Sequence, residues 1–111
     1  MYSSQLLKGT FETIILKLLS ENESLYGYEL IQKVKELSEG EITFPAGSLY
    51  PILHKMEEQG FVVTRRVELG RRVRRYYSLT PSGIEAARDK VEEFMRFART
   101  MITILKPQTE A

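Results

Sequence analysis

The chain has 111 residues, a mass of 12.9 kDa and a formal net charge of +1, and 42% of its residues are hydrophobic, which indicates one small globular domain. The absence of cysteine excludes a disulfide framework, a thiol nucleophile and a cysteine-based zinc site. The first 22 residues show neither an apolar run of membrane-spanning length nor the layout of a signal peptide. We therefore expect a soluble, cytoplasmic protein with no membrane partner.

The first half of the chain predicts three helices. Apolar residues recur at helical spacing over residues 6–20, and a second stripe follows over residues 26–37. Residues 41–44 are a candidate for a short strand. A third helix is predicted over residues 48–59 with Gly47 as its N-cap. Pro51 would then occupy the fourth helical position, where the missing amide costs little.

The second half of the chain predicts a β-hairpin and a long final helix. Residues 61–68 and 72–79 are rich in Val, Thr and Tyr and bracket the turn Leu69-Gly70-Arg71. Thr80 and Pro81 form a favourable helix start, so the last helix is expected to run from there to about residue 105. The predicted divisions are a folded unit over 1–80, the long helix over 81–105 and a disordered tail over 106–111.

Positive charge is concentrated on the predicted hairpin. Residues 65–75 contain six arginines and one glutamate, a local charge of +5 on a nearly neutral chain. Such a patch indicates an anionic partner at one face. Gly70 allows a sharp turn that would place Arg71 and Arg72 at the tip, where a guanidinium can grip a phosphate or enter a narrow minor groove. The alternative is solvated charge that protects an edge strand from aggregation.

The order of the elements is that of a winged helix-turn-helix, a mainly α (α+β) fold. In this fold the third helix enters the major groove of DNA, and the hairpin, or wing, lies along the backbone or the minor groove. With its apolar stripe in the core, the third helix would expose Gly47, Pro51, His54 and, at its far end, Glu58, flanked by Tyr50 and Lys55. A side with few carboxylates near its start suits contact with phosphates. For His54, groove contact and plain exposure both remain open.

The apolar stripe of the last helix indicates a dimer. It runs from Ile84 to Leu105 and is too long for the small winged unit to cover, and soluble monomers avoid large exposed apolar patches. Pairing with a second copy would bury the stripe. Two recognition helices would then lie about 34 Å apart, one turn of duplex.

Four segments together resemble the PadR family of transcriptional regulators. They are LLKGTFETIILKLL (6–19), YGYELIQKV (26–34), GSLYPILHKMEEQGFV (47–62) and GRRVRRYYSLTPSG (70–83). The resemblance covers nearly the whole chain and implies a homodimeric repressor that binds pseudo-palindromic operators and is released by a small aromatic or drug-like effector. By match to the family's GTLYP motif, Ser48, Tyr50 and Pro51 would contact DNA. Gly70 and Arg71 match the tip of the family's wing.

The resemblance also suggests an effector site, and the wing departs from the family's usual sequence in one respect. In some short members of the family the C-terminal helices line a pore, where an aromatic residue stacks on flat ligands. Phe94 falls at that position and Met95 lies beside it, although both could be ordinary dimer-core residues. The family's wing often reads GRPRKYY or GGRRKYY, whereas here Val73 and an additional residue intervene. Which wing arginines face DNA therefore stays open.

A DNA-binding regulator is thus the leading interpretation, and a winged-helix protein-interaction adaptor is the alternative. An enzyme is not expected, because the chain has one histidine, no phosphate-cradling glycine loop and no clustered metal ligands. We accordingly assign no catalytic residue, no cofactor and no metal.

Overall fold

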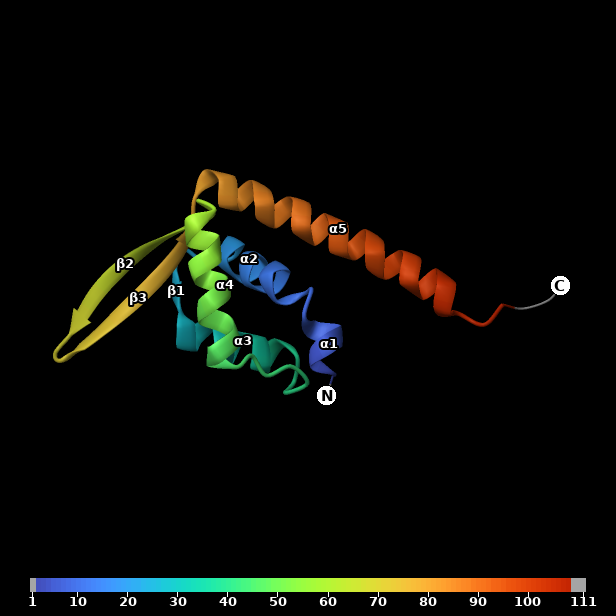
Figure 1. Ribbon diagram of the computed structural model, residues 1–111, viewed down its shortest axis with the longest axis horizontal. Helices are drawn as coiled ribbons and strands as arrows, with labels where there is room; N and C mark the ends of the chain where they lie inside the picture. The colour runs from blue at the N-terminus through green and yellow to red at the C-terminus, as the bar shows by residue number, and fades with distance from the viewer. Residues whose placement is uncertain (1, 109–111) are drawn as a thin grey trace.

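The computed structural model describes residues 2–108, in which a small sheet lies at one side of five helices (Figure 1). The elements are α1 (Ser4–Leu7), α2 (Phe11–Ser20), β1 (Leu25–Tyr26), α3 (Gly27–Leu37), α4 (Ala46–Glu58), β2 (Val62–Leu69), β3 (Arg72–Leu79) and α5 (Pro81–Leu105). The hairpin and the long C-terminal helix after it lie where they were predicted, and the helix before the hairpin is shifted toward the N-terminus by one or two residues. This mixed, mainly helical architecture confirms the predicted fold class.

The sheet has three antiparallel strands in the order β1-β3-β2. β1 covers only Tyr76 and Tyr77 of β3, whereas β2 pairs with β3 along eight residues. The turn consists of Gly70 and Arg71, and Gly70 adopts a positive φ of 64° that favours glycine. Most of the hairpin therefore projects beyond the helices as a wing (Figure 1).

The hydrophobic core lies where α2, α3, α4 and the root of the sheet meet. The fully buried side chains come from these four regions and, in the case of Phe44, from the irregular segment before α4: Ile15, Leu16, Leu30, Phe44, Leu49, Leu53, Met56 and Val62. Tyr77 is buried and Tyr76 is half-buried, and as neighbours on one strand the two tyrosines face opposite sides of the sheet. This core holds α4 by one side and leaves its other side in solvent.

The start of α5 is tied to the segment that joins α4 to the wing. The Thr80 hydroxyl accepts a hydrogen bond from the Gly83 N–H at 3.0 Å and donates to the Gly60 carbonyl at 2.6 Å. The Ser82 hydroxyl donates to the same carbonyl at 3.0 Å, and the Thr80 N–H donates to the Phe61 carbonyl at 3.0 Å. One joint therefore sets the direction of both the wing and α5.

The prediction of one continuous helix over residues 6–20 is wrong. α1 ends at Leu7 and α2 begins at Phe11. Between them the Thr10 hydroxyl and the Thr10 N–H both donate to the Leu7 carbonyl, at 2.8 Å and 2.9 Å. A glycine in this turn disfavours continuous helix, and the threonine side chain offers the backbone another partner.

The strand predicted over residues 41–44 is also wrong, because this segment is irregular. Phe44 is buried and stacks on Phe11 of α2, with ring centroids 4.0 Å apart. The Ile42 N–H donates to the Ser38 hydroxyl at 3.0 Å instead of joining a ladder. The strand that pairs with the free edge of β3 is Leu25–Tyr26, although we had placed Tyr26 at the start of the second helix.

The third predicted helix begins two residues earlier than expected. α4 starts at Ala46 with Pro45 as its N-cap, so Gly47 lies inside the helix and Pro51 is the sixth helical residue. The Pro51 ring therefore removes one intrahelical hydrogen bond, the one to the Gly47 carbonyl. Gly47 is exposed, so solvent can reach the carbonyl that is left without that partner.

Two further predictions concern the end of the chain and membrane association. Residues 106–108 follow the end of α5, and the rest of the predicted tail, residues 109–111, lies outside the described residues. Among residues 2–108, no helix is long and apolar enough to cross a membrane.

Candidate DNA-binding surface

One side of α4 is open to solvent beside the root of the wing (Figure 1). Tyr50 is 48% exposed, and Pro51, His54 and Lys55 are exposed on the same helix. Ser48 is half-buried in the first turn, where its N–H donates to the Pro45 carbonyl at 3.0 Å. The structure thus gathers the exposed candidates of α4 on one accessible side.

His54 has an acidic neighbour on its own helix. Its Nε2 lies 3.7 Å from Oε2 of Glu58, and both side chains are exposed to solvent. An exposed pair of this kind contributes little to stability, and it requires a protonated histidine. The His54 ring therefore stays accessible at the surface of α4.

Tyr50 is packed against the start of α3. A Cβ built on Gly27 would lie only 2.8 Å from Cζ of the Tyr50 ring, so no larger residue fits there without displacement. Gly27 is consequently a positioning residue for the exposed side of α4. We missed this role in the sequence, where the only signal was a glycine at the start of a helix in the segment YGYEL.

The wing tip contains the other predicted DNA contacts. Gly70 and Arg71 form the turn, and Arg72 pairs with Leu69 at the first position of β3. All three are exposed, so the tip presents two guanidinium groups at the outermost part of the wing. The tip and the exposed side of α4 lie on separate elements that the core and the hairpin register hold together.

The outer face of the wing carries a stacked series of arginines and tyrosines, which we call the Arg–Tyr ladder: Arg65, Tyr76, Tyr26 and Arg74. The Arg65 Cζ lies 5.2 Å from the centroid of the Tyr76 ring, and the Arg74 Cζ lies 4.1 Å from that of Tyr26. The two tyrosine rings meet edge to face at 5.4 Å. The ladder therefore spans all three strands, a set of contacts that the sequence reasoning did not find.

The ladder also reaches the first turn of α3. The Tyr26 N–H donates to Oε1 of Glu29 at 3.1 Å. This bond holds in place the tyrosine on which Arg74 stacks. A side-chain hydrogen bond with Tyr76 raises the pKa of the Arg74 guanidinium above its ordinary value. Cation–π stacking of this kind favours a fixed side-chain position. The wing is thus attached to α3 on this face.

The inner face of the wing is the one that packs against α4. The Thr64 hydroxyl donates to Oε2 of Glu57 on α4 at 3.3 Å, and Tyr77 lies opposite Thr64 on β3. Burial raises the pKa of the Tyr77 hydroxyl, while nearby Arg75 acts in the opposite direction. A polar boundary therefore lies between α4 and the root of the wing.

A second candidate site is an apolar groove between α1, α2 and the C-terminal half of α5. It has a volume of about 610 Å³ and is lined mainly by apolar residues, among them Leu6, Leu7, Ile14, Phe94, Phe97 and Met101. Phe94 is 37% exposed there, whereas Met95 is 51% exposed and does not line the groove. The structure thus separates the two residues that we had grouped as an effector site.

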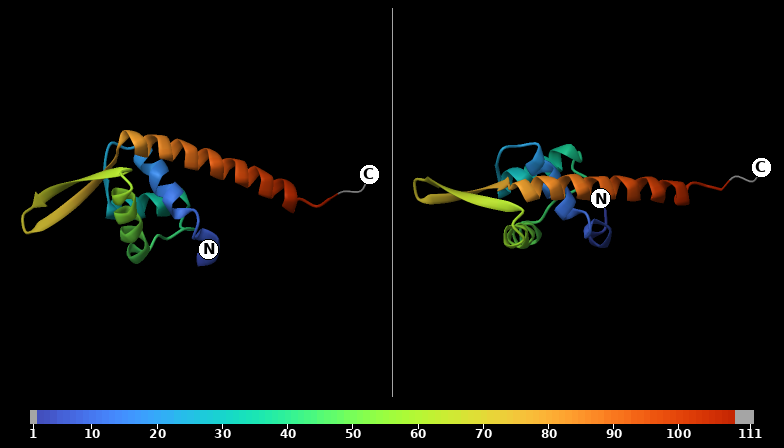
Figure 2. Two further views of the ribbon diagram at one scale, coloured as in Figure 1. Left: turned by 45° about the horizontal axis from the view of Figure 1, so that its top comes forward. Right: turned by 90° about the horizontal axis from the view of Figure 1, so that it is seen from above.

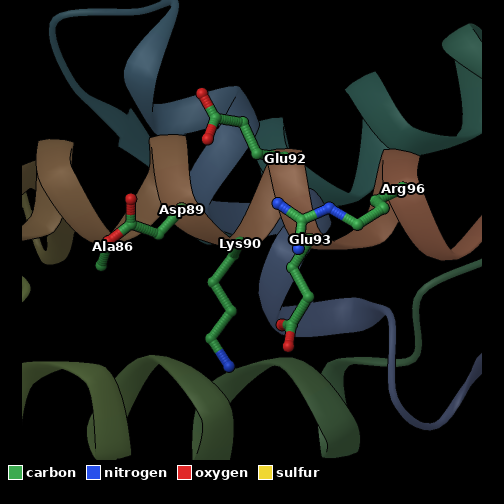
Figure 3. Close-up of a pocket in the computed structure, with 6 residues that line it drawn as sticks. All are labelled: Ala86, Asp89, Lys90, Glu92, Glu93 and Arg96. Atoms are coloured by element: carbon green, nitrogen blue, oxygen red, sulfur yellow. The ribbon is translucent and has the colours of Figure 1, made fainter.

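A third hollow, on α5 itself, is polar. It is lined by Ala86, Asp89, Lys90, Glu92, Glu93 and Arg96 (Figure 3). Its charged side chains are of both signs and spread apart in the view, so they do not form a pocket for an apolar ligand. Among residues 2–108, no group of three acidic or histidine side chains is placed to hold a metal ion.

Comparisons with known proteins identify relatives of this fold. Residues 15–89 match the family described as "Transcriptional regulator PadR-like family". The transcriptional regulator YqjI of Escherichia coli is 34% identical over 87 residues, which are 76% of this chain and 40% of that protein. The transcriptional regulator Rv3488 of Mycobacterium tuberculosis is 33% identical over 88 residues, 79% of this chain and 78% of that protein.

Solved structures agree with these matches. A transcriptional regulator from Clostridium thermocellum superposes with a TM-score of 0.85 at 28% identity and covers 96% of this chain and all of that one. A PadR family regulator from Eggerthella lenta has a TM-score of 0.81 at 25% identity and covers 94% of this chain and 88% of that one. These relatives are named as regulators, which confirms the predicted resemblance and the prediction that the chain is not an enzyme.

Proposed function

The chain belongs to the PadR-like family of transcriptional regulators, and from this premise we propose that it is a cytoplasmic, homodimeric repressor of a pseudo-palindromic operator. The observation that carries DNA binding is the accessible side of α4 beside a wing with a local charge of +5. The major-groove contacts are assigned to Ser48, Tyr50, Pro51 and His54, and Lys55 is assigned to a phosphate. The tip residues Gly70, Arg71 and Arg72 contact the backbone or the minor groove.

The exposed apolar surface of α5 supports the homodimer. Within the described residues, large apolar side chains are left in solvent on α1 and along α5: Leu6, Ile84, Phe94, Met95, Phe97, Ile102, Ile104 and Leu105. A second copy that covers this surface would bury it and remove a patch that soluble monomers avoid. Two-fold pairing would also present two copies of α4 to successive turns of duplex.

The apolar groove supports a small aromatic effector. Phe94 and Phe97 lie in it with ring centroids 6.3 Å apart, and Met101 provides an adaptable wall. The groove lies between α5 and the α1–α2 unit, so a ligand there would act on the orientation of α5. A change in that orientation would alter the spacing of the two α4 helices and release the operator.

DNA binding is tested on duplexes selected from a random pool. Arg71→Ala and Arg72→Ala should each weaken binding to every sequence and reduce the slope of log K against log salt by about 1. Tyr50→Ala should lose more affinity for the selected operator than for random duplex, because it alters the groove-reading helix. Wild-type protein that ignores duplex in dilute buffer would refute the repressor and favour the protein-interaction adaptor.

The effector role is tested by adding flat aromatic cations to the preformed protein–DNA complex. Phe94→Ala should reduce ligand-induced release, since it removes a ring from the groove. Met95→Ala is the matched control, because its side chain lies outside the groove on the neighbouring residue. No release by wild-type protein over a broad panel of such ligands would contradict this part of the proposal.

A further inference from the structure

The register of the hairpin divides its arginines between two faces. Residues directly opposite in an antiparallel pair share a face of the sheet. Arg65 lies opposite Tyr76 and Arg74 lies opposite Val67, so both belong to the outer face and to the Arg–Tyr ladder. Arg66 and Arg75 lie opposite each other on the inner face, the side of the wing that packs against α4.

The Arg66–Arg75 pair is unfavourable in the free protein. Like charges directly across an antiparallel pair repel each other. Within residues 2–108, no ion pair involves either guanidinium, and Arg75 interacts with the hydroxyl of Tyr77. Two carboxylates lie on this side of the wing: Glu57 accepts a hydrogen bond from Thr64, and Glu68 lies two residues from Arg66, opposite Val73. Neither carboxylate is ion-paired with Arg66 or Arg75.

The position of this pair connects the two parts of the proposed DNA surface. Arg75 lines a hollow of about 350 Å³ together with Tyr50 of α4, Gly27 and Tyr77. At a rise of about 3.3 Å per strand residue, Arg66 lies about 7 Å beyond Thr64, where the wing contacts α4, and about 13 Å before Gly70 at the tip. The pair thus lies between the groove-reading helix and the tip.

We infer that Arg66 and Arg75 form a cross-strand clamp for one backbone phosphate of bound DNA. If α4 occupies a major groove and the tip reaches the adjacent minor groove, the sugar–phosphate strand between the two grooves must cross the inner face of the wing. A phosphate placed there would neutralise the repulsion between the two guanidinium groups, each of which can donate two hydrogen bonds to it. Arg65 and Arg74 hold the wing and do not contact the phosphate.

The clamp rests on the proposed DNA-binding function and is tested with two double variants. Arg66→Gln with Arg75→Gln is compared with Arg65→Gln with Arg74→Gln. Each pair removes two positive charges from the same two strands, so the long-range field changes by a similar amount. Affinity for the selected operator is measured between about 50 and 200 mM salt, the range in which phosphate contacts are resolved.

The double variant Arg66→Gln with Arg75→Gln should lower the salt slope by about 1, the value expected for one phosphate contact. The outer-face double variant should keep the wild-type slope. Equal slopes for the two double variants would overturn the clamp and leave only a general charge effect. If Arg71→Ala and Arg72→Ala still weaken binding in that case, the proposed DNA function stands without the clamp. If the wild-type protein had no affinity for duplex, both the clamp and the proposed DNA-binding function would be refuted.

Thermal unfolding of the free protein provides a second test, which distinguishes the phosphate clamp from a structural role for Arg66. Arg66→Gln should raise the melting temperature in the absence of DNA, because it relieves a cross-strand repulsion. Arg74→Gln should lower it, because that change removes the stacking on Tyr26. A lower melting temperature for Arg66→Gln would show that Arg66 has a stabilising partner and would overturn the clamp.

Discussion

At Gly27 the ring of Tyr50 occupies the space that a side chain would need. The atoms nearest to an added Cβ belong to this ring, including Cζ at 2.8 Å and Cε1 at 3.0 Å. The glycine lies on α3 and the tyrosine on α4, so the contact sets how the two helices of the helix-turn-helix meet. It also determines where a predicted DNA contact is presented to solvent.

Gly27→Ala should push the Tyr50 ring aside, because the atoms nearest the added Cβ are the outer end of this side chain, which is 48% exposed. The ring has solvent to move into, so the steric cost should stay small beside the gain in helix propensity of at most about 1 kcal/mol. Operator affinity should fall as Tyr50 is displaced, while urea unfolding should show little loss of stability. Gly47→Ala is the control for stability, because nothing lies within 4 Å of its added Cβ. Unchanged operator affinity in Gly27→Ala would contradict a positioning role for Gly27.

The wing shows what residue-level prediction could and could not provide. The arginine cluster, the turn glycine and the opposite faces of Tyr76 and Tyr77 could all be predicted from composition and alternation. The partners of each arginine could not, because a one-residue change in the turn moves every side chain of one strand to the other face. The bracketed turn was three residues long, whereas the structure has the two-residue turn Gly70-Arg71.

At the scale of elements, the joint at Thr80 links α4, the wing and α5. Thr80→Val keeps the shape of the side chain but removes the N-cap of α5 and the hydrogen bond to the Gly60 carbonyl. Loss of such a cap costs about 1 kcal/mol, with an upper range near 2 kcal/mol. Chemical denaturation should show this loss of unfolding free energy.

The control for this joint lies on the same helix. The Thr103 hydroxyl donates to the Arg99 carbonyl at 3.0 Å, four residues earlier on an exposed turn of α5. Thr103→Ala removes only that local bond and raises helix propensity, so stability should stay level or rise slightly. If both threonine variants had the same effect, Thr80 would act as an ordinary helix residue and the joint would not matter.

Helix positions could be predicted well from the sequence where the apolar period was long, as in α5. The errors occurred where distant contacts decide local structure. Phe44 lies in a segment with strand-like composition, yet its ring stacks on Phe11 more than 30 positions earlier in the chain. Likewise, Leu25 and Tyr26 form a strand only because β3 offers a free edge beside them. Neither partner is visible in a local window of sequence.

At the scale of the whole molecule, α5 extends well beyond the body that its first turns contact. Its N-terminal part lies over α2, and its C-terminal half continues away from the core in both views of Figure 2. The order of elements was sufficient to predict this arrangement. The exposed apolar surface of α5 could be predicted only as a stripe, because the groove also depends on where α1 and α2 lie beside α5.

The proposed homodimer can be disrupted by a charge placed in this groove. Phe97 lines the groove and is 57% exposed in the single chain, so Phe97→Glu should leave each subunit folded and prevent pairing. Sedimentation at micromolar concentration should then report a monomer, and circular dichroism should report unchanged helix content. Arg99→Glu is the control, since at about 100° per residue its side chain lies on the other side of α5.

DNA binding by the monomeric variant tests whether the dimer interface and the DNA surface are independent of each other. On a complete operator, Phe97→Glu should lose about 10²- to 10⁴-fold in affinity, because linkage of two half-site contacts is lost. On a duplex with a single half-site, it should bind as well as Arg99→Glu, since α4 and the wing are unchanged. A Phe97→Glu protein that stayed dimeric would show that the copies pair through another surface. Equal losses on both duplexes would instead show that the groove and the DNA surface are coupled within one subunit.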